Sequence, residues 1–266
     1  MAGKSGKKGH ATRQRALVTG ASAGIGAIFA ERLAQSGYDL IIVARDRQRL
    51  EKLADKLRQS DNVQVEVLSA DLTDPTELHV VERVVSDGNL DLLVNNAGFG
   101  TYGTFAELDA DREESEIRLN VIALVRLTRA ALPAMIERGS GAIINVSSMA
   151  AFQASPYNAT YGATKAYVNS FTEALYEELR GTGVQVQALC PGFTHTEFQE
   201  RAGIDVARVP SIAWMEADDV VNASLAALQN GDLICIPGFT NRVVTLVAGA
   251  IPRSITRRIS GYLVKP

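Results

Sequence analysis

The 266-residue sequence predicts an α/β fold in which one parallel sheet is covered by helices on both faces. From Ala16 onwards, short runs rich in β-branched residues alternate with longer stretches whose apolar residues recur at helical spacing. Most of the short runs are continuously apolar, which is typical of strands buried on both faces of a parallel sheet. Repeated strand-helix-strand units of this kind wind a sheet doubly, with right-handed crossovers.

Seven strands are expected, one for each apolar run. The runs are ALVT from Ala16, LIIVA from Leu40, VQVEVL from Val63, LDLLV from Leu90, AIINVS from Ala142, VQVQALC from Val184 and LICI from Leu233. Helices are expected between them, for example over Ile25–Ser36, Arg47–Gln59, Glu113–Glu137 and Thr160–Arg180. Because no linker or repeat divides this part of the chain, we expect a single domain over residues 15–240. In such a sheet, ligands bind at the carboxyl ends of the strands.

The composition excludes several classes of function. Hydrophobic residues make up 46% and charged residues 21%, and the net charge is −3. This balance excludes a collagen-like or disordered chain and argues against nucleic-acid binding, which favours a basic domain. Cys190 and Cys235 lie far apart in apolar runs, so we expect neither a disulfide scaffold nor a metal site. A reducing, cytoplasmic location fits this cysteine usage.

Both ends of the chain differ from the predicted domain. Residues 1–14 are basic and rich in Gly, Ser and Lys, which predicts a disordered lead-in without a signal-peptide core. No run of about 18 apolar residues occurs, so we expect no transmembrane helix. Residues 241–266 combine apolar groups with Arg and Lys but no acid, which predicts a helical and basic extension of the domain. It would close a pocket or cover a neighbouring subunit, and peripheral contact with an anionic membrane is the alternative.

A glycine-rich turn, Thr-Gly-Ala-Ser-Ala-Gly-Ile-Gly over residues 19–26, follows the first expected strand and opens the first helix. Its glycines allow a tight turn, close approach of a pyrophosphate and packing of helix on strand. The N–H groups at the start of a helix also favour an anion. The turn therefore predicts dinucleotide binding, with contacts from Gly20, Ser22, Ala23, Gly24, Ile25 and Gly26.

The spacing Thr-Gly-x-x-x-Gly-Ile-Gly resembles the dinucleotide turn of the short-chain dehydrogenase/reductase family. Further motifs resemble that family in the same order: Asn-Asn-Ala-Gly at 95–98, Ser148, Tyr-x-x-x-Lys at 161–165 and Pro-Gly at 191–192. The resemblance extends over about residues 16–237 and implies a Rossmann-type catalytic domain. The stretches 97–103, 156–165 and 237–243 look most like the branch that contains bacterial ketoacyl and mycolate reductases.

The end of the second strand bears on the choice of cofactor. An acid there would bond the ribose 2′-OH of NAD, whereas a basic side chain accommodates the 2′-phosphate of NADP. Arg45 comes first after the apolar run, with Asp46 next, and a guanidinium can bind phosphate through two hydrogen bonds. We therefore predict NADP(H), with NAD(H) as the alternative. Ala23 stands where some NADP-preferring family members carry a basic residue, so Arg45 would serve the 2′-phosphate alone.

The resemblance implies further cofactor contacts at the later strand ends. An acid at position 71 would contact the adenine, and the Asn-Asn-Ala-Gly strand end would line the cofactor. The Pro-Gly segment after the sixth strand would lie along the nicotinamide. These implied contacts are Asp71, Leu72, Asn96, Ala97, Gly98, Pro191, Gly192, Thr194 and Thr196.

Tyr161 and Lys165 are four residues apart on an expected helix and share one face. A nearby ammonium favours the phenolate and lowers the tyrosine pKa from its reference value of about 10. Ser148 lies 13 positions before Tyr161, the spacing of the family's catalytic serine, and Asn120 matches the fourth member of its catalytic set. His195 is not favoured as a base, because Tyr161 already supplies proton transfer and no acid partner for His195 is evident.

The roles of these four residues follow partly from what a carbonyl reduction needs. Ser148 and Tyr161 would hydrogen-bond the substrate oxygen, where negative charge develops, and Tyr161 would deliver the proton. The resemblance implies that Lys165 binds the nicotinamide ribose, that Tyr161 also contacts the cofactor, and that Asn120 orients a water that replenishes the proton.

The sequence thus predicts an NADPH-dependent reductase of a hydrophobic small-molecule carbonyl, with a 3-oxoacyl or other lipid-derived ketone favoured. Apolar residues over 197–213 would form a lid on the substrate. One alternative is an NAD-dependent secondary-alcohol or steroid dehydrogenase. Another is a dinucleotide-binding redox sensor without turnover. Because family members often dimerise through their two long helices, we also expect a homo-oligomer.

Overall fold

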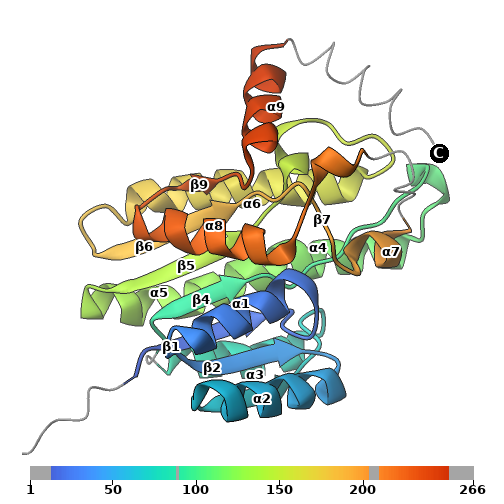
Figure 1. The fold of residues 1–266 in the computed structure, drawn as a ribbon. Helices are drawn as coiled ribbons and strands as arrows, with labels where there is room; N and C mark the ends of the chain where they lie inside the picture. The colour runs from blue at the N-terminus through green and yellow to red at the C-terminus, as the bar shows by residue number, and fades with distance from the viewer. Residues whose placement is uncertain (1–12, 88–89, 204–209, 252–266) are drawn as a thin grey trace, which may run out of the picture.

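Seven parallel strands form the central sheet of the protein (Figure 1). The computed structural model describes residues 13–87, 90–203 and 210–251. Every neighbouring pair of strands is parallel. The order across the sheet is β3 (Val65–Ser69), β2 (Asp39–Ala44), β1 (Arg15–Thr19), β4 (Leu92–Asn95), β5 (Gly141–Val146), β6 (Val184–Leu189) and β9 (Ile234–Cys235). The predicted doubly wound sheet of seven strands is confirmed.

Helices cover both faces of this sheet. The helices α1 (Gly24–Gln35), α2 (Arg47–Asp61) and α8 (Ala217–Gln229) lie on one face, and α3 (Pro75–Ser86), α5 (Leu124–Arg138) and α6 (Ala159–Glu178) lie on the other. The helices that the sequence predicts over Ile25–Ser36, Arg47–Gln59 and Thr160–Arg180 correspond to α1, α2 and α6, with ends that differ by one or two residues.

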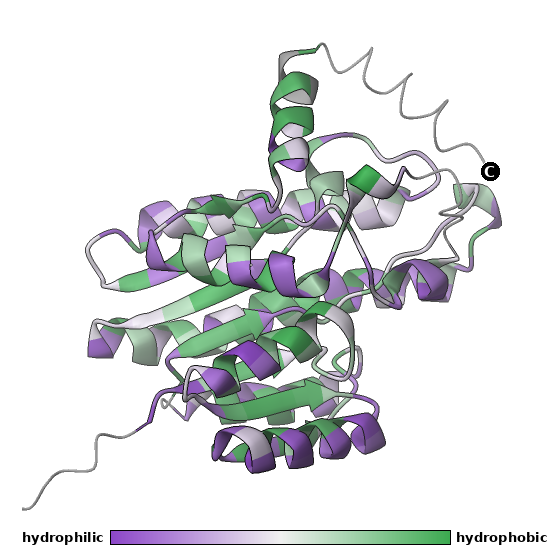
Figure 2. Cartoon of the chain, in the orientation of Figure 1, coloured by the Kyte–Doolittle hydropathy of each residue, from purple (hydrophilic) through white to green (hydrophobic). Residues whose placement is uncertain are grey.

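Successive residues of the strands point to opposite faces, which explains why the strand sequences are continuously apolar. On β1, Val18 belongs to the apolar cluster that contains Phe29 and Val220, whereas its neighbour Leu17 belongs to the cluster that contains Leu127. All five side chains are at most 1% exposed. In Figure 2 the strands are accordingly hydrophobic, while the outer surfaces of the covering helices are hydrophilic.

The helix predicted over Glu113–Glu137 has three parts in the structure. It begins as α4 (Ala110–Ile117), continues through a π-helical segment, η2 (Arg118–Ala123), and ends as α5. A π turn inserts an extra residue and rotates the side chains on either side of it, and it is frequent at functional sites. The prediction of one regular α-helix is therefore wrong at its centre, which is where Asn120 lies.

One helical segment, Ala110–Arg138, is long and apolar enough to cross a membrane by length and composition alone. Charged residues such as Arg126 interrupt its apolar runs, which is why a count of uninterrupted runs does not find it. Its buried side chains, Leu127 and Ala131 among them, pack in the core beneath the sheet. The core helix of an α/β domain has the same composition.

Several shorter elements follow the sheet strands. They are η1 (Phe105–Glu107), η3 (Met149–Phe152), β7 (Phe193–Thr194), α7 (Phe198–Ala202), η4 (Ser211–Ala213) and β8 (Trp214–Met215). Strands β7 and β8 pair with each other in a small second sheet. This pairing holds both ends of the predicted lid against each other, while residues 204–209 of the lid lie outside the described residues.

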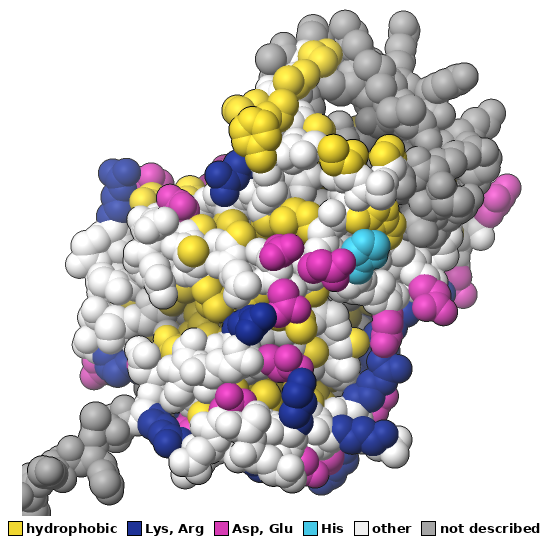
Figure 3. All heavy atoms as spheres, viewed as in Figure 1, with side chains coloured by type: hydrophobic (Ala, Val, Ile, Leu, Met, Phe, Trp, Pro, Cys, Tyr) yellow, Lys and Arg dark blue, Asp and Glu magenta, His cyan; other side chains and the backbone are white. Residues whose placement is uncertain are grey.

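The last described helix, α9 (Phe239–Ala250), projects from the body of the protein (Figure 1). Asn241 anchors its first turn by donating a hydrogen bond to the Pro237 carbonyl at 2.9 Å. Further along, Leu246 is 75% exposed and Val247 54%, and hydrophobic side chains gather in this region of Figure 3. The remainder of the predicted basic extension, residues 252–266, and most of the predicted lead-in lie outside the described residues.

Candidate active site

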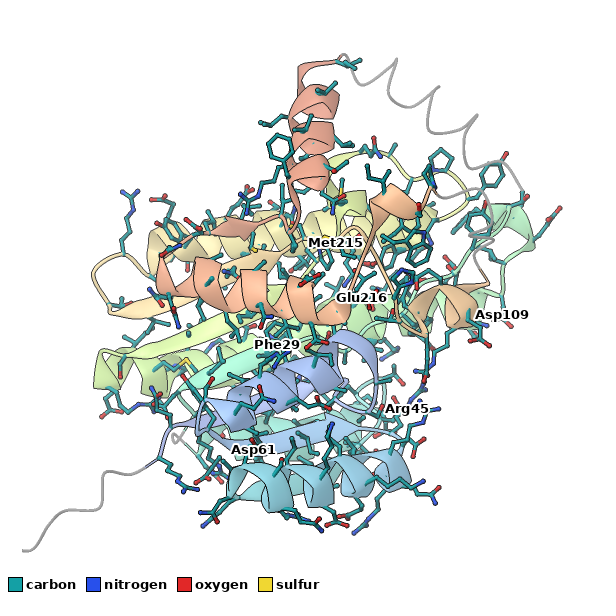
Figure 4. All side chains as sticks on the ribbon, viewed as in Figure 1. Phe29, Arg45, Asp61, Asp109, Met215 and Glu216 are labelled. Atoms are coloured by element: carbon teal, nitrogen blue, oxygen red, sulfur yellow. The ribbon has the colours of Figure 1, made fainter. Side chains whose placement is uncertain are left out.

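The predicted site residues lie at the carboxyl ends of the strands, around the point where β1 separates β2 from β4. Crossovers leave β1 in opposite directions at this point, so that the loops after β1 and β4 diverge and leave room for a ligand. In Figure 4, Arg45 at the end of β2 lies on this edge of the sheet, below the segments that carry Met215, Glu216 and Asp109.

The glycine-rich turn is tightly built against the end of β4. Gly20 and Gly24 have positive φ values of 66° and 55°, which favour glycine. A Cβ at Gly26 would lie 2.3 Å from the Gly20 carbonyl oxygen and 2.4 Å from Asn96 Nδ2. Asn96 Nδ2 donates to the Thr19 carbonyl at 2.9 Å, and Thr19 Oγ1 accepts from the Asn96 backbone N–H at 3.0 Å. These contacts fix the turn to the neighbouring strand end.

The start of α1 suits a phosphate group. Its N-cap residue, Ala23, provides no side-chain cap, and the first turn carries no acid. The N–H groups of that turn are thus available to an anion, and the helix dipole favours one. Thr196 lies beside this turn, since a Cβ at Gly24 would meet Thr196 Cγ2 at 3.1 Å. The predicted contacts on the turn and Thr196 therefore face one another.

The two candidates for cofactor selection at the end of β2 have different surroundings. Asp46 caps α2, because its carboxylate accepts the Arg49 backbone N–H at 3.0 Å and also pairs with the Arg49 side chain at 3.4 Å. The Arg45 side chain is 72% exposed and lies 3.7 Å from Asp71. Burial raises the pKa of Asp71, but hydrogen bonds from Thr73 and the nearby Arg45 together bring it below its ordinary value. Arg45 is thus the more accessible side chain.

The structure brings Ser148, Tyr161 and Lys165 together between β5 and α6. Ser148 follows β5, and its hydroxyl accepts the Ala150 backbone N–H at 3.1 Å and is hydrogen-bonded to Tyr161. Lys165 is 5% exposed, and its ammonium donates to the Val146 carbonyl at 2.8 Å. The same ammonium lies 5.5 Å from the centre of the Tyr161 ring.

Asn120 reaches this group from the π-helical segment. Its Oδ1 accepts the Phe99 backbone N–H at 3.1 Å, and its Nδ2 donates to the Phe99 carbonyl at 2.9 Å and to Thr164 Oγ1 at 3.1 Å. A Cβ at Gly98 would lie 2.9 Å from Asn120 Oδ1 and 3.6 Å from Lys165 Nζ. Asn120 therefore joins the loop after β4 to α6, instead of packing only within its own helix.

The pKa values correct one expectation. Burial raises the pKa of Tyr161 to about 12, with a further increase from the charge of Glu116, although the hydrogen bond with Ser148 lowers it. Burial also lowers the pKa of Lys165 to about 8. The expected lowering of the Tyr161 pKa by Lys165 is therefore not found, because desolvation disfavours the charged forms of both groups.

The segment after β6 places the remaining predicted contacts. Thr194 is 3% exposed, and its hydroxyl donates to the Gly192 carbonyl at 3.1 Å. His195 does have an acid near it, contrary to expectation, because Glu216 lies 3.9 Å away across the β7–β8 pair. Its ring stacks on Trp214 with a centroid distance of 4.6 Å.

Sequence reasoning missed two buried acids on α4, the helix that precedes Asn120. Glu116 is 0% exposed and Glu113 is 8% exposed, both on α4. Glu113 and Glu116 are three residues apart and share one face of α4, and this spacing was the available signal. Among the described residues, no group of three or more His, Cys, Asp or Glu side chains could hold a metal ion.

Comparisons with known proteins agree with this geometry. The family model described as short chain dehydrogenase matches residues 14–206. Ketoacyl reductase HetN of Nostoc is 31% identical over 222 residues, which cover 82% of this chain and 76% of HetN. A short-chain dehydrogenase from Sphingobium yanoikuyae, solved in complex with NADPH, is 40% identical with a TM-score of 0.82 and coverage of 92% and 95%. A bulky-bulky ketone specific alcohol dehydrogenase from Comamonas testosteroni is 32% identical, with a TM-score of 0.77 and coverage of 91% and 96%.

Proposed function

The chain belongs to the short-chain dehydrogenase/reductase family of oxidoreductases, and we propose that it reduces bulky, lipid-derived ketones such as 3-oxoacyl compounds with NADPH. The observation that carries the proposal is the group formed by Ser148, Tyr161 and Lys165 beside the glycine-rich turn. Such a group can hydrogen-bond a carbonyl oxygen and give it a proton while a bound dinucleotide reacts at the carbon.

Tyr161 is the proton donor of the proposed reduction. With its pKa raised to about 12, the phenol keeps its proton at neutral pH and can donate it to a substrate oxygen. Oxidation of an alcohol would use the same groups, with Tyr161 as the base. Ser148 holds the phenol in place, and the Lys165 ammonium, when protonated, stabilises the phenolate that remains after donation. Asn120 would position the water that returns a proton to Lys165.

The contacts at the strand ends support NADPH as the hydride donor. When bound, NADPH supplies a hydride to the carbonyl carbon. The glycine-rich turn and the uncapped start of α1 would hold its pyrophosphate, and the exposed guanidinium of Arg45 would bind the 2′-phosphate. Asp46 is already engaged as a helix cap, which disfavours it as the ribose acceptor that NADH needs. The NADPH complex of the Sphingobium relative supports the same choice.

Aromatic side chains on Tyr161 and in the loops after β4 and before α6 support a bulky, apolar substrate. Phe198 packs on the Tyr161 ring with a centroid distance of 5.3 Å, and Tyr102 and Tyr157 form a second aromatic pair at 6.4 Å. Aromatic side chains of this kind bind apolar groups through buried surface. The bulky ketones of the Comamonas relative and the ketoacyl substrate named for HetN are consistent with this class.

A rate assay with matched variants tests the proposal. NADPH oxidation is followed with 3-oxoacyl thioesters of increasing chain length, an aryl ketone, a steroid ketone and small aldehydes. We expect Tyr161→Phe to lower the rate with the best ketone by at least about 100-fold, the contribution of a general acid. Tyr167→Phe on the same helix, where the side chain is 45% exposed, is the control and should leave the rate unchanged.

Three results would contradict the proposal in different ways. Turnover of small aldehydes alone would overturn the substrate class. A preference for NADH and an alcohol or steroid would favour the NAD-dependent dehydrogenase instead. Binding of NADPH without turnover of any carbonyl would favour a redox sensor.

We also propose that the protein is a cytoplasmic homo-oligomer. Ile122 beside α5 is 46% exposed, Ile136 is 43% exposed and Tyr167 on α6 is 45% exposed, which leaves apolar surface on the two long helices. Sedimentation of the purified protein tests this, since a monomer at micromolar concentration would refute it.

A further inference from the structure

Two carboxyl groups are buried on the inner face of α4, and only one oxygen of each accepts a hydrogen bond. Thr101 Oγ1 donates to Glu116 Oε2 at 2.9 Å, and the Thr160 hydroxyl donates to Glu113 Oε2. The other oxygen of each acid, Oε1, is buried without a hydrogen-bond partner. Among the described residues, no Lys, Arg or His forms an ion pair with either acid.

Two ionised carboxylates in this position would be costly, because each would be buried with an unpaired oxygen and near a like charge. Glu113 and Glu116 are three residues apart on the helix, a spacing that brings their side chains together. A single proton on the pair removes one of the two charges and turns one unpaired oxygen into a donor. The pKa of Glu116 agrees with this, because burial raises it to about 7 and Glu113 contributes in the same direction.

Glu116 also lies next to the catalytic group. It is one helical turn before Asn120, and its negative charge raises the pKa of both Tyr161 and Lys165 on α6. Three groups change the pKa of Glu116: Glu113 on the same helix raises it, whereas Lys165 on α6 and Thr101 in the loop after β4 lower it. Thr160, which donates to Glu113, directly precedes Tyr161.

We propose that the buried acid pair holds one proton, on Glu116, and that Glu116 is a positioning residue whose charge controls how readily Tyr161 gives its proton to the substrate. Neutral Glu116 leaves Tyr161 the stronger acid, whereas the charge of ionised Glu116 favours the protonated forms of Lys165 and Tyr161 and so makes Tyr161 the weaker acid. The acid pair neither gains nor loses a proton over the catalytic cycle. The control of Tyr161 by Glu116 rests on the proposed reduction by Tyr161, whereas the proton on the acid pair does not.

Two measurements test the inference, and neither of them requires the enzyme to turn over a substrate. The carboxylic-acid band of the infrared spectrum reports the proton on Glu116. The ionisation of Tyr161 is measured as the difference in phenolate absorbance between each protein and its Tyr161→Phe version. In the wild type we expect a carboxylic-acid band that disappears near neutral pH. Glu116→Gln should lose this band and form the Tyr161 phenolate about one pH unit lower, since a negative charge nearby is removed.

Glu113→Gln should give a different result from Glu116→Gln, whereas a general loss of packing would affect both variants in the same way. It removes only the charge that raises the pKa of Glu116, so the infrared band should persist and titrate at lower pH. The control is Glu114→Gln on the same helix, where the side chain is 62% exposed and pairs with Arg118. This control should match the wild type in both measurements.

The pH profile of kcat/KM for ketone reduction then completes the test. Its alkaline limb should move to lower pH in Glu116→Gln and stay in place in Glu114→Gln. Absence of the infrared band in the wild type overturns the proton on Glu116, and an unmoved phenolate titration in Glu116→Gln overturns the control of Tyr161. If the band and phenolate respond as expected while no carbonyl is reduced, the proposed function fails and the acid pair stands.

Discussion

Replacing Glu116 by glutamine should change how the stability of the protein depends on pH. The folded pKa of Glu116 is about 7, against an ordinary value of 4.5. Because the fold favours the protonated acid, its contribution to stability is fully present below pH 4.5 and is lost as pH rises to about 7. Glutamine cannot ionise, and its amide oxygen can still accept the Thr101 hydroxyl, so the variant should lack this loss.

The magnitude follows from the two pKa values. They differ by about 2.5 pH units, and each unit corresponds to about 1.4 kcal/mol. The wild type should therefore lose about 3 kcal/mol of unfolding free energy relative to Glu116→Gln as the pH is raised from below 4.5 to above 7.

Urea unfolding of the two proteins at a series of pH values measures this difference directly. The protomer concentration must be the same throughout, because subunit association contributes to the measured stability. Glu114→Gln provides the control, since that exposed acid should follow the wild type at every pH. Parallel stability curves for the wild type and Glu116→Gln would refute the reasoning, because they would show that Glu116 ionises alike in the folded and unfolded chain.

Three further predictions concern the cofactor site and the core. Arg45→Ala should weaken NADPH binding by roughly 10- to 150-fold through loss of charged hydrogen bonds worth about 1.5–3 kcal/mol, with NADH binding unchanged, as measured by nicotinamide fluorescence titration. Gly26→Ala should abolish measurable binding of either cofactor, because the new methyl group would lie 2.3 Å from the Gly20 carbonyl oxygen. Thr172→Val should lower the unfolding free energy by about 1–3 kcal/mol, since it leaves the buried Asn145 amide, now 3.0 Å from Thr172 Oγ1, without an acceptor.

The sequence was sufficient for those parts of the fold that depend on local patterns. Strands buried on both faces need apolar side chains at every position, so β1 and β2 were visible as continuous runs. The glycine-rich turn was visible because its backbone angles exclude most other residues, as the φ of 66° at Gly20 shows. The π turn had no such signal, because it depends on how Asn120 packs against the loop at Phe99, which lies 21 residues away.

The electrostatics of the site could not be read from motifs alone. The spacing of Tyr161 and Lys165 correctly suggested that they are neighbours, yet the sign of the pKa shift of Tyr161 depends on burial, which is a property of the folded chain. The partners of His195 and Glu116 come from other elements, at Glu216 and Thr101. Contacts of this kind follow from the strand order, which places distant loops side by side.

Cofactor preference illustrates how local structure decides between neighbouring side chains. Sequence alone leaves both Arg45 and Asp46 at the end of β2 as candidates. Asp46 Oδ1 accepts the Arg49 backbone N–H as an N-cap worth about 1 kcal/mol, and its other oxygen lies 3.4 Å from the Arg49 side chain, so a ribose hydroxyl would compete with Arg49 for that oxygen. Arg45 would leave only an exposed pair with Asp71, 3.7 Å away, and such pairs contribute about 0–1 kcal/mol. Because a charged bond to phosphate exceeds that loss, the end of β2 favours NADPH through the charge of Arg45, and the engagement of Asp46 with Arg49 adds to this preference.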